Sequence, residues 1–303
     1  MRNSIYKIAE SDVGGSEAQV IPNLGAWLFS YKIRNKYGDL VDIFHTDPEL
    51  LELWPNKIHC GSPILFPQAG PCSLNRKPGL YSYGGRTFSM AQHGFGRCSP
   101  WMIVSHEKNF ITLQLTHTKE SLKNYPFEFL AEIQYSIEQE NLNWRISVLN
   151  QSDQKMPFSL GFHPYFKIPN GAENFYVNLP PGKQAIPNGS IEEWNLKKNS
   201  NPLVPAAKNL SNTYFQTNIE PKNRSAIIED VYSGMKLELD FKLAPDFDTL
   251  AIWSAGPTLP YLCVEPWSAL PNALNTKNGI TELAPGERWS GRFAIHTVIR
   301  PRN

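Results

Sequence analysis

The chain has 303 residues, which is enough for one large all-β domain or for two domains of ordinary size. Its 29 Lys and Arg residues nearly balance 28 Asp and Glu residues, and no basic block is present, so a nucleic-acid partner is not expected. The N-terminal residues lack the apolar run of a secretory signal, and no stretch reaches the roughly 20 apolar residues that span a bilayer. We therefore expect a soluble, cytoplasmic protein with no membrane partner. No feature of the sequence specifies an oligomeric state.

The composition favours strands joined by many turns, because the chain holds 25 Pro, 20 Gly, 8 Trp, 12 Tyr and 16 Phe residues. The four cysteines form no Cys-x-x-Cys pair and have apolar neighbours, which is typical of reduced thiols in a core or near a site. A zinc site is therefore not expected. These cysteines are Cys60, Cys72, Cys98 and Cys263.

In chain order, the first predicted element is a short helix. Asp47 is a good N-cap before a proline at the first helical position, and this helix extends no further than Leu53. Apolar residues that alternate with polar ones then predict half-buried strands. These strands cover residues 111–115, 142–148 and 237–241. Two antiparallel pairs are also predicted, 129–137 with 141–149 and 249–254 with 261–265.

Residues 169–212 are rich in Pro, Asn, Gly and Lys and have weak periodicity. This pattern predicts a long surface excursion near the site, with one or two irregular strands. No repeat of fixed period and no linker divides the chain. We therefore expect one large antiparallel all-β domain over residues 1–303, with few short helices.

Three segments each place one ionisable side chain among aromatic, Gly or Pro residues: 92–97, 161–166 and 264–267. An imidazole or a carboxylate beside aromatic rings loses the water that stabilises its charged form, and this shifts its pKa toward the neutral range. Two histidines and one glutamate in such settings indicate acid and base catalysis on an uncharged, ring-shaped substrate.

His163 precedes a proline at the end of a predicted strand, so its backbone is expected to be extended, with Tyr165 on the same face. The alternative is a core histidine that bonds to a carbonyl. Glu265 closes an apolar strand, where a carboxylate is costly unless it pairs, binds a ligand or titrates. Trp267 beside it suggests a stacking wall for a sugar face. The alternative for Glu265 is a structural salt bridge.

His93 precedes Gly94, which lets a ligand approach closely because glycine has no side chain. Arg97 is a directional donor to hydroxyls or to a phosphate, or else the partner of a structural carboxylate. Asp246 and Asp248 are loop acids for which turn capping is the simpler role. The histidines expected to be structural or exposed are His45, His106, His117 and His296.

Five segments in this order resemble the aldose 1-epimerase family, and more narrowly its galactose mutarotase-like branch, which includes glucose-6-phosphate 1-epimerases. The segments are residues 61–67, 92–97, 161–166, 263–267 and 283–287. The similarity extends from about Leu24 to His296. The resemblance implies a β-supersandwich and an enzyme that interconverts the α and β anomers of a small-molecule sugar without a cofactor or a metal.

The resemblance also implies roles for single residues. His163 matches the histidine that protonates the ring oxygen, and Glu265 matches the base. His93 matches a second site histidine that binds the opening sugar. Arg97 matches a substrate-binding position of the phosphate-handling branch, and Asp248 matches an acid that binds a hydroxyl.

Two departures from the family pattern bear on the substrate. His59 stands where many relatives have an arginine, and Gly70 is followed by a proline where a basic residue is often found. Both changes weaken a phosphate site and favour a neutral aldohexose. A hexose 6-phosphate is the alternative, with charge supplied by Lys57, Arg76, Lys77 or Arg86. A non-catalytic sugar-binding protein on the same fold is the second alternative.

Overall fold

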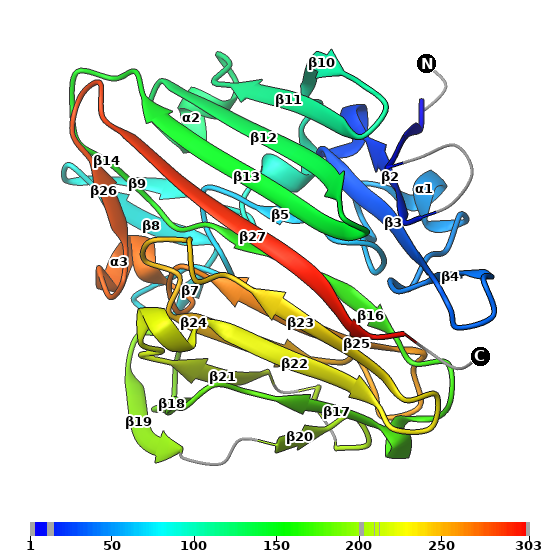
Figure 1. The fold of residues 1–303 in the computed structure, drawn as a ribbon. Helices are drawn as coiled ribbons and strands as arrows, with labels where there is room; N and C mark the ends of the chain where they lie inside the picture. Colours follow the sequence, from blue (N-terminus) through cyan, green and yellow to red (C-terminus); the bar gives the residue numbers. More distant parts are fainter. Residues whose placement is uncertain (1–3, 11–14, 200–202, 209, 212, 301–303) are drawn as a thin grey trace.

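The computed structural model describes residues 4–10, 15–199, 203–208, 210–211 and 213–300 (Figure 1). Its largest sheet has nine strands, and every neighbouring pair in it is antiparallel. In order across the sheet these strands are β10 (Met102–His106), β11 (Phe110–Thr116), β12 (Phe129–Glu138), β13 (Asn141–Asn150), β27 (Arg288–Ile299), β23 (Met235–Asp240), β22 (Ser225–Asp230), β17 (Phe175–Asn178) and β20 (Leu203–Pro205).

A second sheet has eight antiparallel strands and carries the residues that matter most below. In order they are β19 (Trp194–Asn199), β18 (Gly182–Pro187), β21 (Tyr214–Thr217), β24 (Thr249–Trp253), β25 (Tyr261–Trp267), β15 (Gly161–Phe162) and β5 (Ile64–Leu65), with β16 (Tyr165–Lys167) also paired to β25.

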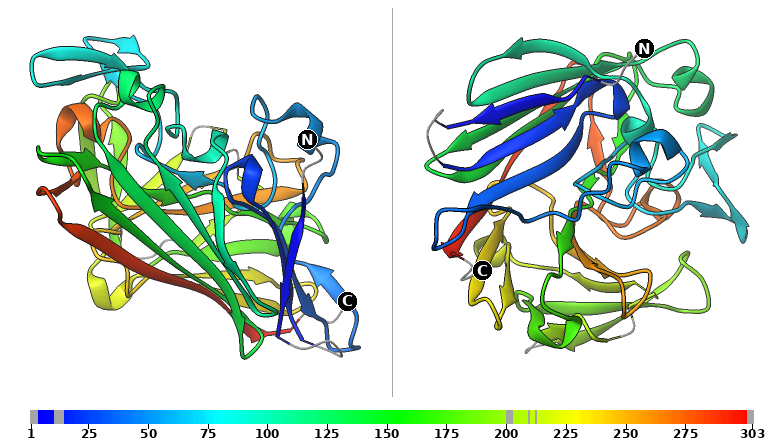
Figure 2. Two further views of the ribbon diagram at one scale, coloured as in Figure 1. Left: turned by 90° about the horizontal axis from the view of Figure 1, so that it is seen from above. Right: turned by 90° about the vertical axis from the view of Figure 1, so that its right-hand side faces the viewer.

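A third sheet of four strands lies beside the β12–β13 hairpin (Figure 2), where the Tyr31 hydroxyl donates to the Glu140 carbonyl at 3.1 Å. Its strands are β1 (Tyr6–Ala9), β2 (Glu17–Ile21), β3 (Trp27–Arg34) and β4 (Leu40–Asp42). Three two-stranded ribbons pair β14 (Met156–Phe158) with β26 (Thr281–Leu283), β6 (Ser73–Leu74) with β7 (Lys77–Pro78), and β8 (Leu80–Tyr83) with β9 (Arg86–Ser89).

The helices of the described residues are single turns. They are α1 (Leu50–Leu53), α2 (Ser121–Asn124) and α3 (Ala273–Thr276), with 3-10 turns η1 (Pro22–Leu24), η2 (Gly96–Cys98), η3 (Ala172–Asn174) and η4 (Pro221–Asn223). None of the helices in these described parts is long and apolar enough to cross a membrane.

One continuous hydrophobic core joins side chains of the three large sheets. Strand β25 shows how the eight-stranded sheet contributes to it. Leu262 and Val264 point into this core, whereas the alternate residues Cys263 and Trp267 belong to separate apolar clusters on the opposite face. One face of β25 therefore holds the fold together, and the other is left to form a site.

The all-β prediction is confirmed, and so are both predicted antiparallel pairs, which are β12 with β13 and β24 with β25. The first helix is shorter at its start than predicted. Asp47 does cap a turn, because its Oδ1 accepts the Glu49 N–H at 3.0 Å, but the helix begins only at Leu50.

The prediction of one or two strands within residues 169–212 was wrong, because β17, β18, β19 and β20 all lie there. Residues 200–202, 209 and 212 of this stretch are outside the described part of the chain. β19 and β20 are the terminal strands of their sheets, and exposed edge strands need no apolar alternation. The hydrophobic pattern therefore undercounts such strands.

Candidate active site

A cleft of about 240 Å³ opens on the face of the eight-stranded sheet that points away from the large core. Seven of the eight predicted site residues line it, whereas Asp248 does not. The seven are His59, His93, Arg97, His163, Tyr165, Glu265 and Trp267. The sequence segments that carry them are therefore brought to one place by the fold.

The strand register brings His163 and Glu265 together. Gly161 of β15 pairs with Trp267 of β25, and Tyr165 of β16 pairs with Cys263. Both pairs follow one antiparallel register, which places His163 opposite Glu265. Because alternate residues of a strand share a face, the two side chains meet on the cleft side of the sheet.

His163 and Glu265 are in direct contact, with 3.4 Å between Nε2 and Oε2. Only 6% of His163 and 1% of Glu265 is exposed to solvent. The Trp267 indole N–H donates to the same Oε2 at 3.1 Å and so holds the carboxylate in place. The contact therefore places an acid and a base 3.4 Å apart in a buried part of the cleft.

Burial acts on the two groups in opposite directions. It raises the pKa of Glu265 well above its ordinary value, opposed by the Trp267 hydrogen bond and the charge of Arg97. Burial, with the nearby His93 and Arg97, lowers the pKa of His163 well below its ordinary value. Burial therefore disfavours the charged form of each group, so a His163 imidazolium is a stronger acid, and a Glu265 carboxylate a stronger base, than the same group in water.

Aromatic rings fix the orientation of the His163 imidazole. It stacks on Tyr165 with 4.6 Å between ring centroids and 10° between planes, and Trp253 meets it edge-on at 5.9 Å. His163 Nδ1 is buried and has no hydrogen-bond partner among the described residues. A core histidine that bonds to a carbonyl, the alternative considered for this position, does not fit this arrangement.

His93 is held by its backbone and by its ring. Its N–H donates to the Gly70 carbonyl at 3.0 Å, and the Gly70 N–H donates back to Nδ1 at 3.1 Å. Because Nδ1 accepts, the ring proton lies on Nε2 in the neutral form, and burial lowers the pKa of His93 well below its ordinary value. His93 is therefore a neutral ring in the cleft, where it meets the ring of His163 at 5.4 Å. Its Nε2 lies 3.2 Å from the side-chain amide of Gln92, which a bound sugar oxygen would replace as the partner of this nitrogen.

The local backbone explains the glycine that follows His93. Both residues have positive φ, +67° at His93 and +69° at Gly94. A Cβ on Gly94 would lie 2.1 Å from the Phe66 carbonyl oxygen, so only glycine fits there. For His93 the left-handed conformation is uncommon, and non-glycine residues held in it gather at functional sites.

Arg97 lies in η2 and brings a positive charge to the cleft. One of its terminal nitrogens donates to the Gln92 carbonyl at 3.1 Å, while its Nε is buried without a partner among the described residues. The Trp54 indole N–H donates to the Arg97 carbonyl at 3.1 Å and anchors the turn. No carboxylate pairs with Arg97 within the described part of the chain, so the alternative of a structural salt bridge does not apply.

His59 forms the outer layer of an aromatic stack. Its ring lies parallel to that of Tyr165, with 6.1 Å between centroids, and meets Trp253 at 5.8 Å. Burial and the charges of Lys57 and Arg97 lower the pKa of His59. The ring is therefore held neutral and polar at the cleft wall.

Asp248, the eighth predicted site residue, is not brought to this cleft by the fold. Asp248 lines a second cleft, together with Arg224 and Asp246. Of strand β24, Trp253 lines the first cleft, and Asp248 precedes the first residue of this strand. Asp248 Oδ1 accepts the Thr249 hydroxyl at 2.9 Å, and a backbone hydrogen bond from Asn218 also acts on this carboxylate, which agrees with the simpler role of turn capping.

Nine further residues line the cleft and were not predicted for the site, among them Gln92, Thr213, Phe215 and Trp253. The pairing of Phe215 with Ala251, and of Ala251 with Glu265, places Phe215 in the same row as the acid and base. The alternation in residues 249–254 could have identified Trp253 as a neighbour of the site. Phe215 and Thr213 follow the weakly patterned excursion, where no signal pointed to them.

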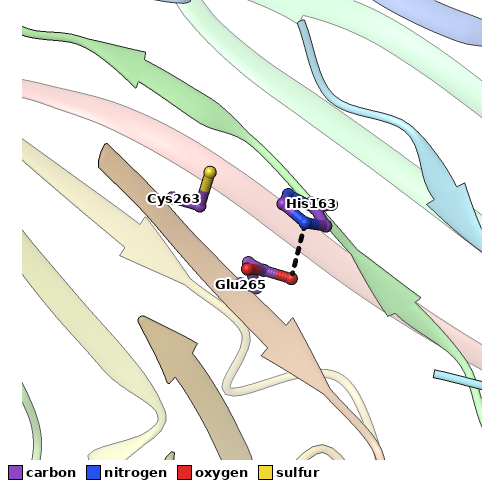
Figure 3. Close-up of side chains that lie close together, drawn as sticks. All are labelled: His163, Cys263 and Glu265. Atoms are coloured by element: carbon purple, nitrogen blue, oxygen red, sulfur yellow. Dashed lines mark ion pairs between the residues drawn. The ribbon is translucent and has the colours of Figure 1, made fainter. Parts of the chain in front are cut away.

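Cys263 lies next to the acid and base (Figure 3). One ligand atom from each of His163, Cys263 and Glu265 lies within 4.8 Å of the other two. All four cysteines are free thiols, as expected. These three side chains are the ones that could hold a metal ion among the described residues.

Comparison with known proteins agrees with this geometry. A family model described as aldose 1-epimerase matches residues 11–296. The chromosomal LacX protein of Lactococcus lactis subsp. lactis is 27% identical over 271 residues, which cover 84% of this chain and 86% of LacX.

Two solved structures show the same fold. The Slr1438 protein of Synechocystis sp. PCC 6803 superposes with a TM-score of 0.83 at 24% identity, covering 98% of this chain and 96% of that one. A galactose mutarotase-like protein of Lactobacillus casei ATCC 334 superposes with a TM-score of 0.80 at 22% identity, covering 97% of this chain and 99% of that one. At such identities the likeness concerns the fold alone.

Proposed function

This chain belongs to the aldose 1-epimerase family, and we propose that it interconverts the α and β anomers of a hexose by acid and base catalysis. The observation that carries the proposal is the buried contact of 3.4 Å between His163 and Glu265. The anomeric hydroxyl and the ring oxygen of a sugar are bonded to the same carbon. An acid and a base that act on them together must therefore lie close to each other, as these two side chains do.

In the proposed reaction, Glu265 removes the proton of the anomeric hydroxyl while His163 delivers a proton to the ring oxygen. The bond between the anomeric carbon and the ring oxygen breaks, and the sugar opens to an aldehyde. The aldehyde rotates about its first carbon–carbon bond and recloses from the other face, with each side chain reversing its role. Each group contributes roughly 10²–10⁴-fold to the rate, and the cycle restores both protonation states.

Burial suits both groups to these roles. By lowering the pKa of His163 it makes the imidazolium a stronger acid toward a weakly basic ring oxygen. By raising the pKa of Glu265 it makes the carboxylate a stronger base toward a weakly acidic hydroxyl. His93 offers its Nε2–H as a neutral donor to a sugar oxygen, since Nδ1 is occupied by the Gly70 N–H. Trp267 orients the base and supplies an apolar wall.

A non-catalytic sugar-binding protein is the less favoured candidate. A binding site gains nothing from burying a carboxylate against an imidazole, because each buried ionisable group costs free energy when it is not used. His93, His163 and Glu265 are all present and face one cleft. The arrangement therefore supports an enzyme over a binding protein.

We further propose a neutral hexose as the substrate. Among the described residues that line the cleft, Arg97 is the one Lys or Arg. Of the other candidate cations, Arg86 lies over the Phe88 ring at 5.3 Å, and Arg76 and Lys77 are not among the lining residues. Lys57 is not a lining residue either, although its charge acts on His59. A phosphate dianion is best held by two or more cationic side chains, which this cleft does not provide.

The test is to follow pure anomers of glucose and galactose, freshly dissolved, by polarimetry or NMR with and without the protein. The proposal expects equilibration faster than the spontaneous rate for at least one of the two sugars, in buffer that contains a chelator. A protein that binds the sugar, as seen by ligand NMR, but leaves the spontaneous rate unchanged would show the non-catalytic alternative to be correct.

A further inference from the structure

A third side chain lies beside the proposed acid and base, and the epimerase mechanism does not use it. Cys263 is fully buried and comes two residues before Glu265 on β25, so both side chains leave the strand on the same face. Figure 3 shows the thiol, the imidazole of His163 and the carboxylate gathered over β25. One ligand atom from each lies within 4.8 Å of the other two.

These three donors suit a zinc-type ion. Imidazole nitrogen, thiolate sulfur and carboxylate oxygen are the ligands that Zn²⁺ takes in proteins, at about 2.0–2.3 Å. Around a tetrahedral ion, ligand atoms at those distances lie roughly 3.3–3.8 Å apart. The separation of 3.4 Å between His163 Nε2 and Glu265 Oε2 already falls in this range. Small side-chain movements bring the sulfur within reach as well.

The charges of the cluster also balance. A divalent ion that replaces the thiol proton and the proton shared by His163 and Glu265 is bound by one thiolate, one carboxylate and one neutral imidazole. Two negative charges then match the two positive charges of the ion, so the buried complex is neutral overall. Arg97 is the nearby cation that opposes binding, because its charge acts on both Glu265 and His163.

We propose that His163, Cys263 and Glu265 bind a divalent transition-metal ion of the zinc type, and that the bound ion inhibits the enzyme by occupying its acid and base. The ion enters from the cleft, which His163 and Glu265 line, and its fourth ligand is water on that side. The inhibition rests on the proposed function, whereas the binding rests on the geometry alone.

The surroundings indicate a reversible inhibitory site. A histidine that holds a resident metal ion donates its second ring N–H to an acceptor, and removal of such a partner weakens binding by about 10–100-fold. His163 Nδ1 has no partner among the described residues. Glu265, in contrast, is oriented by the Trp267 indole. We therefore expect a chelator to remove the ion and restore activity in full.

Binding is tested with Co²⁺ as a spectroscopic probe, which requires no activity. A cobalt–thiolate bond gives a near-ultraviolet charge-transfer band, so one equivalent of Co²⁺ should produce this band and Zn²⁺ should abolish it. The band should be absent in Cys263→Ala and present in Cys98→Ala. Cys98 is the matched control because it is the most accessible of the four thiols. A band that survives in Cys263→Ala, or no band in the wild-type protein, overturns the proposal.

Inhibition is tested by adding Zn²⁺ to the anomer assay. The apparent KM for the sugar should rise with Zn²⁺, and excess chelator should reverse the effect. Cys263→Ala, compared with its own metal-free rate, should need at least about tenfold more Zn²⁺ for half inhibition, since one of three ligands is lost. Equal sensitivity in Cys263→Ala and the wild-type protein contradicts the inhibitory role.

Two outcomes separate this inference from the proposed function. A Cys263-dependent cobalt band in a protein without epimerase activity keeps the metal site and rejects the proposed function. Epimerase activity without the cobalt band keeps the proposed function and rejects the metal site. If Cys263→Ala fails to fold, as judged by circular dichroism, Cys263→Ser replaces the sulfur by an oxygen of similar position and serves as the second variant.

Discussion

Two of the polar clefts formed by the described residues differ in character, and the larger of the two is not the proposed active site. The second cleft measures about 510 Å³, against about 240 Å³ for the first, and is lined by Arg224, Asp246, Asp248 and other charged residues. Asp246 is exposed, and the charges of both aspartates act on Arg224, whose guanidinium also donates to the Ala244 carbonyl at 2.8 Å. The charges of Arg224 and the two aspartates therefore compensate one another, and burial raises the pKa of Asp248 only against the opposing charge of Arg224.

In the first cleft three ionisable side chains, those of His93, His163 and Glu265, are almost fully buried and lie close to one another. Exposure is 6% for His93, 6% for His163 and 1% for Glu265. Burial gives these groups shifted pKa values and therefore chemical use at neutral pH. The comparison of the two clefts shows that the burial of a few titratable groups indicates the active site better than the volume of the cleft does.

The largest effect is expected for Glu265→Gln, which keeps the shape of the side chain and removes the base. We expect kcat/KM for anomer exchange to fall by about 10²–10⁴-fold, measured by NMR exchange or polarimetry. His163→Ala should cost a similar factor, and the double variant should lose little more than the worse single one, because the two groups act as a unit. Full activity in either single variant would remove that residue from the mechanism.

His93→Asn should have the next largest effect. Asparagine tolerates positive φ, and its side-chain oxygen can still accept the Gly70 N–H, but it lacks the Nε2–H that reaches the cleft. The loss of one such donor to a developing charge, about 1.5–3 kcal/mol, predicts a decrease of about 10–100-fold in kcat/KM. His93→Ala is the comparison, because it also leaves the Gly70 N–H unpaired and should lower the melting temperature. Unchanged kinetics in His93→Asn would assign His93 a structural role.

The pH dependence tests the shared proton. Burial lowers the pKa of His163, so a second proton is accepted only below the ordinary imidazole range. Burial raises the pKa of Glu265, so the last proton leaves only above the ordinary carboxyl range. With a chelator present, kcat/KM should therefore be flat near neutral pH and fall about tenfold per pH unit beyond each limb. A single-limb profile would mean that one of the two groups does not titrate in the mechanism.

The sequence was sufficient to predict the cleft residues that belong to a motif. It was insufficient to predict those that reach the cleft only because two distant strands pair. His163, Glu265 and Trp267 follow from strand alternation and from the cost of burying polar groups in apolar segments. Phe215 enters the cleft because β21 pairs with β24, and no local pattern determines which strands become neighbours. The side of Asp248 could not be predicted, because a loop residue before a strand has no alternation to fix it.

A comparison of neutral and phosphorylated sugars tests the charge of the first cleft. With Arg97 as the one cationic lining residue described, kcat/KM for glucose or galactose should equal or exceed that for glucose 6-phosphate. The measurement compares these sugars at low and high salt. A phosphate preference of tenfold or more, about 1.4 kcal/mol, that shrinks with salt would reveal a second cation at the cleft and reverse this assignment.

The smallest effect is expected for Asp248→Asn in the second cleft. The asparagine side-chain oxygen can still accept the Thr249 hydroxyl, which Asp248 now receives at 2.9 Å, and Thr249 keeps its contact of 2.8 Å with the Thr217 hydroxyl. Strand β24 therefore retains its place beside β25, and the acid and base retain their geometry. We expect kcat/KM to stay within about twofold of the wild-type value, which is the range of substitutions that leave a site untouched. If the same assay shows a tenfold loss while the melting temperature is unchanged, Asp248 acts on the sugar, and the distinction between the two clefts fails.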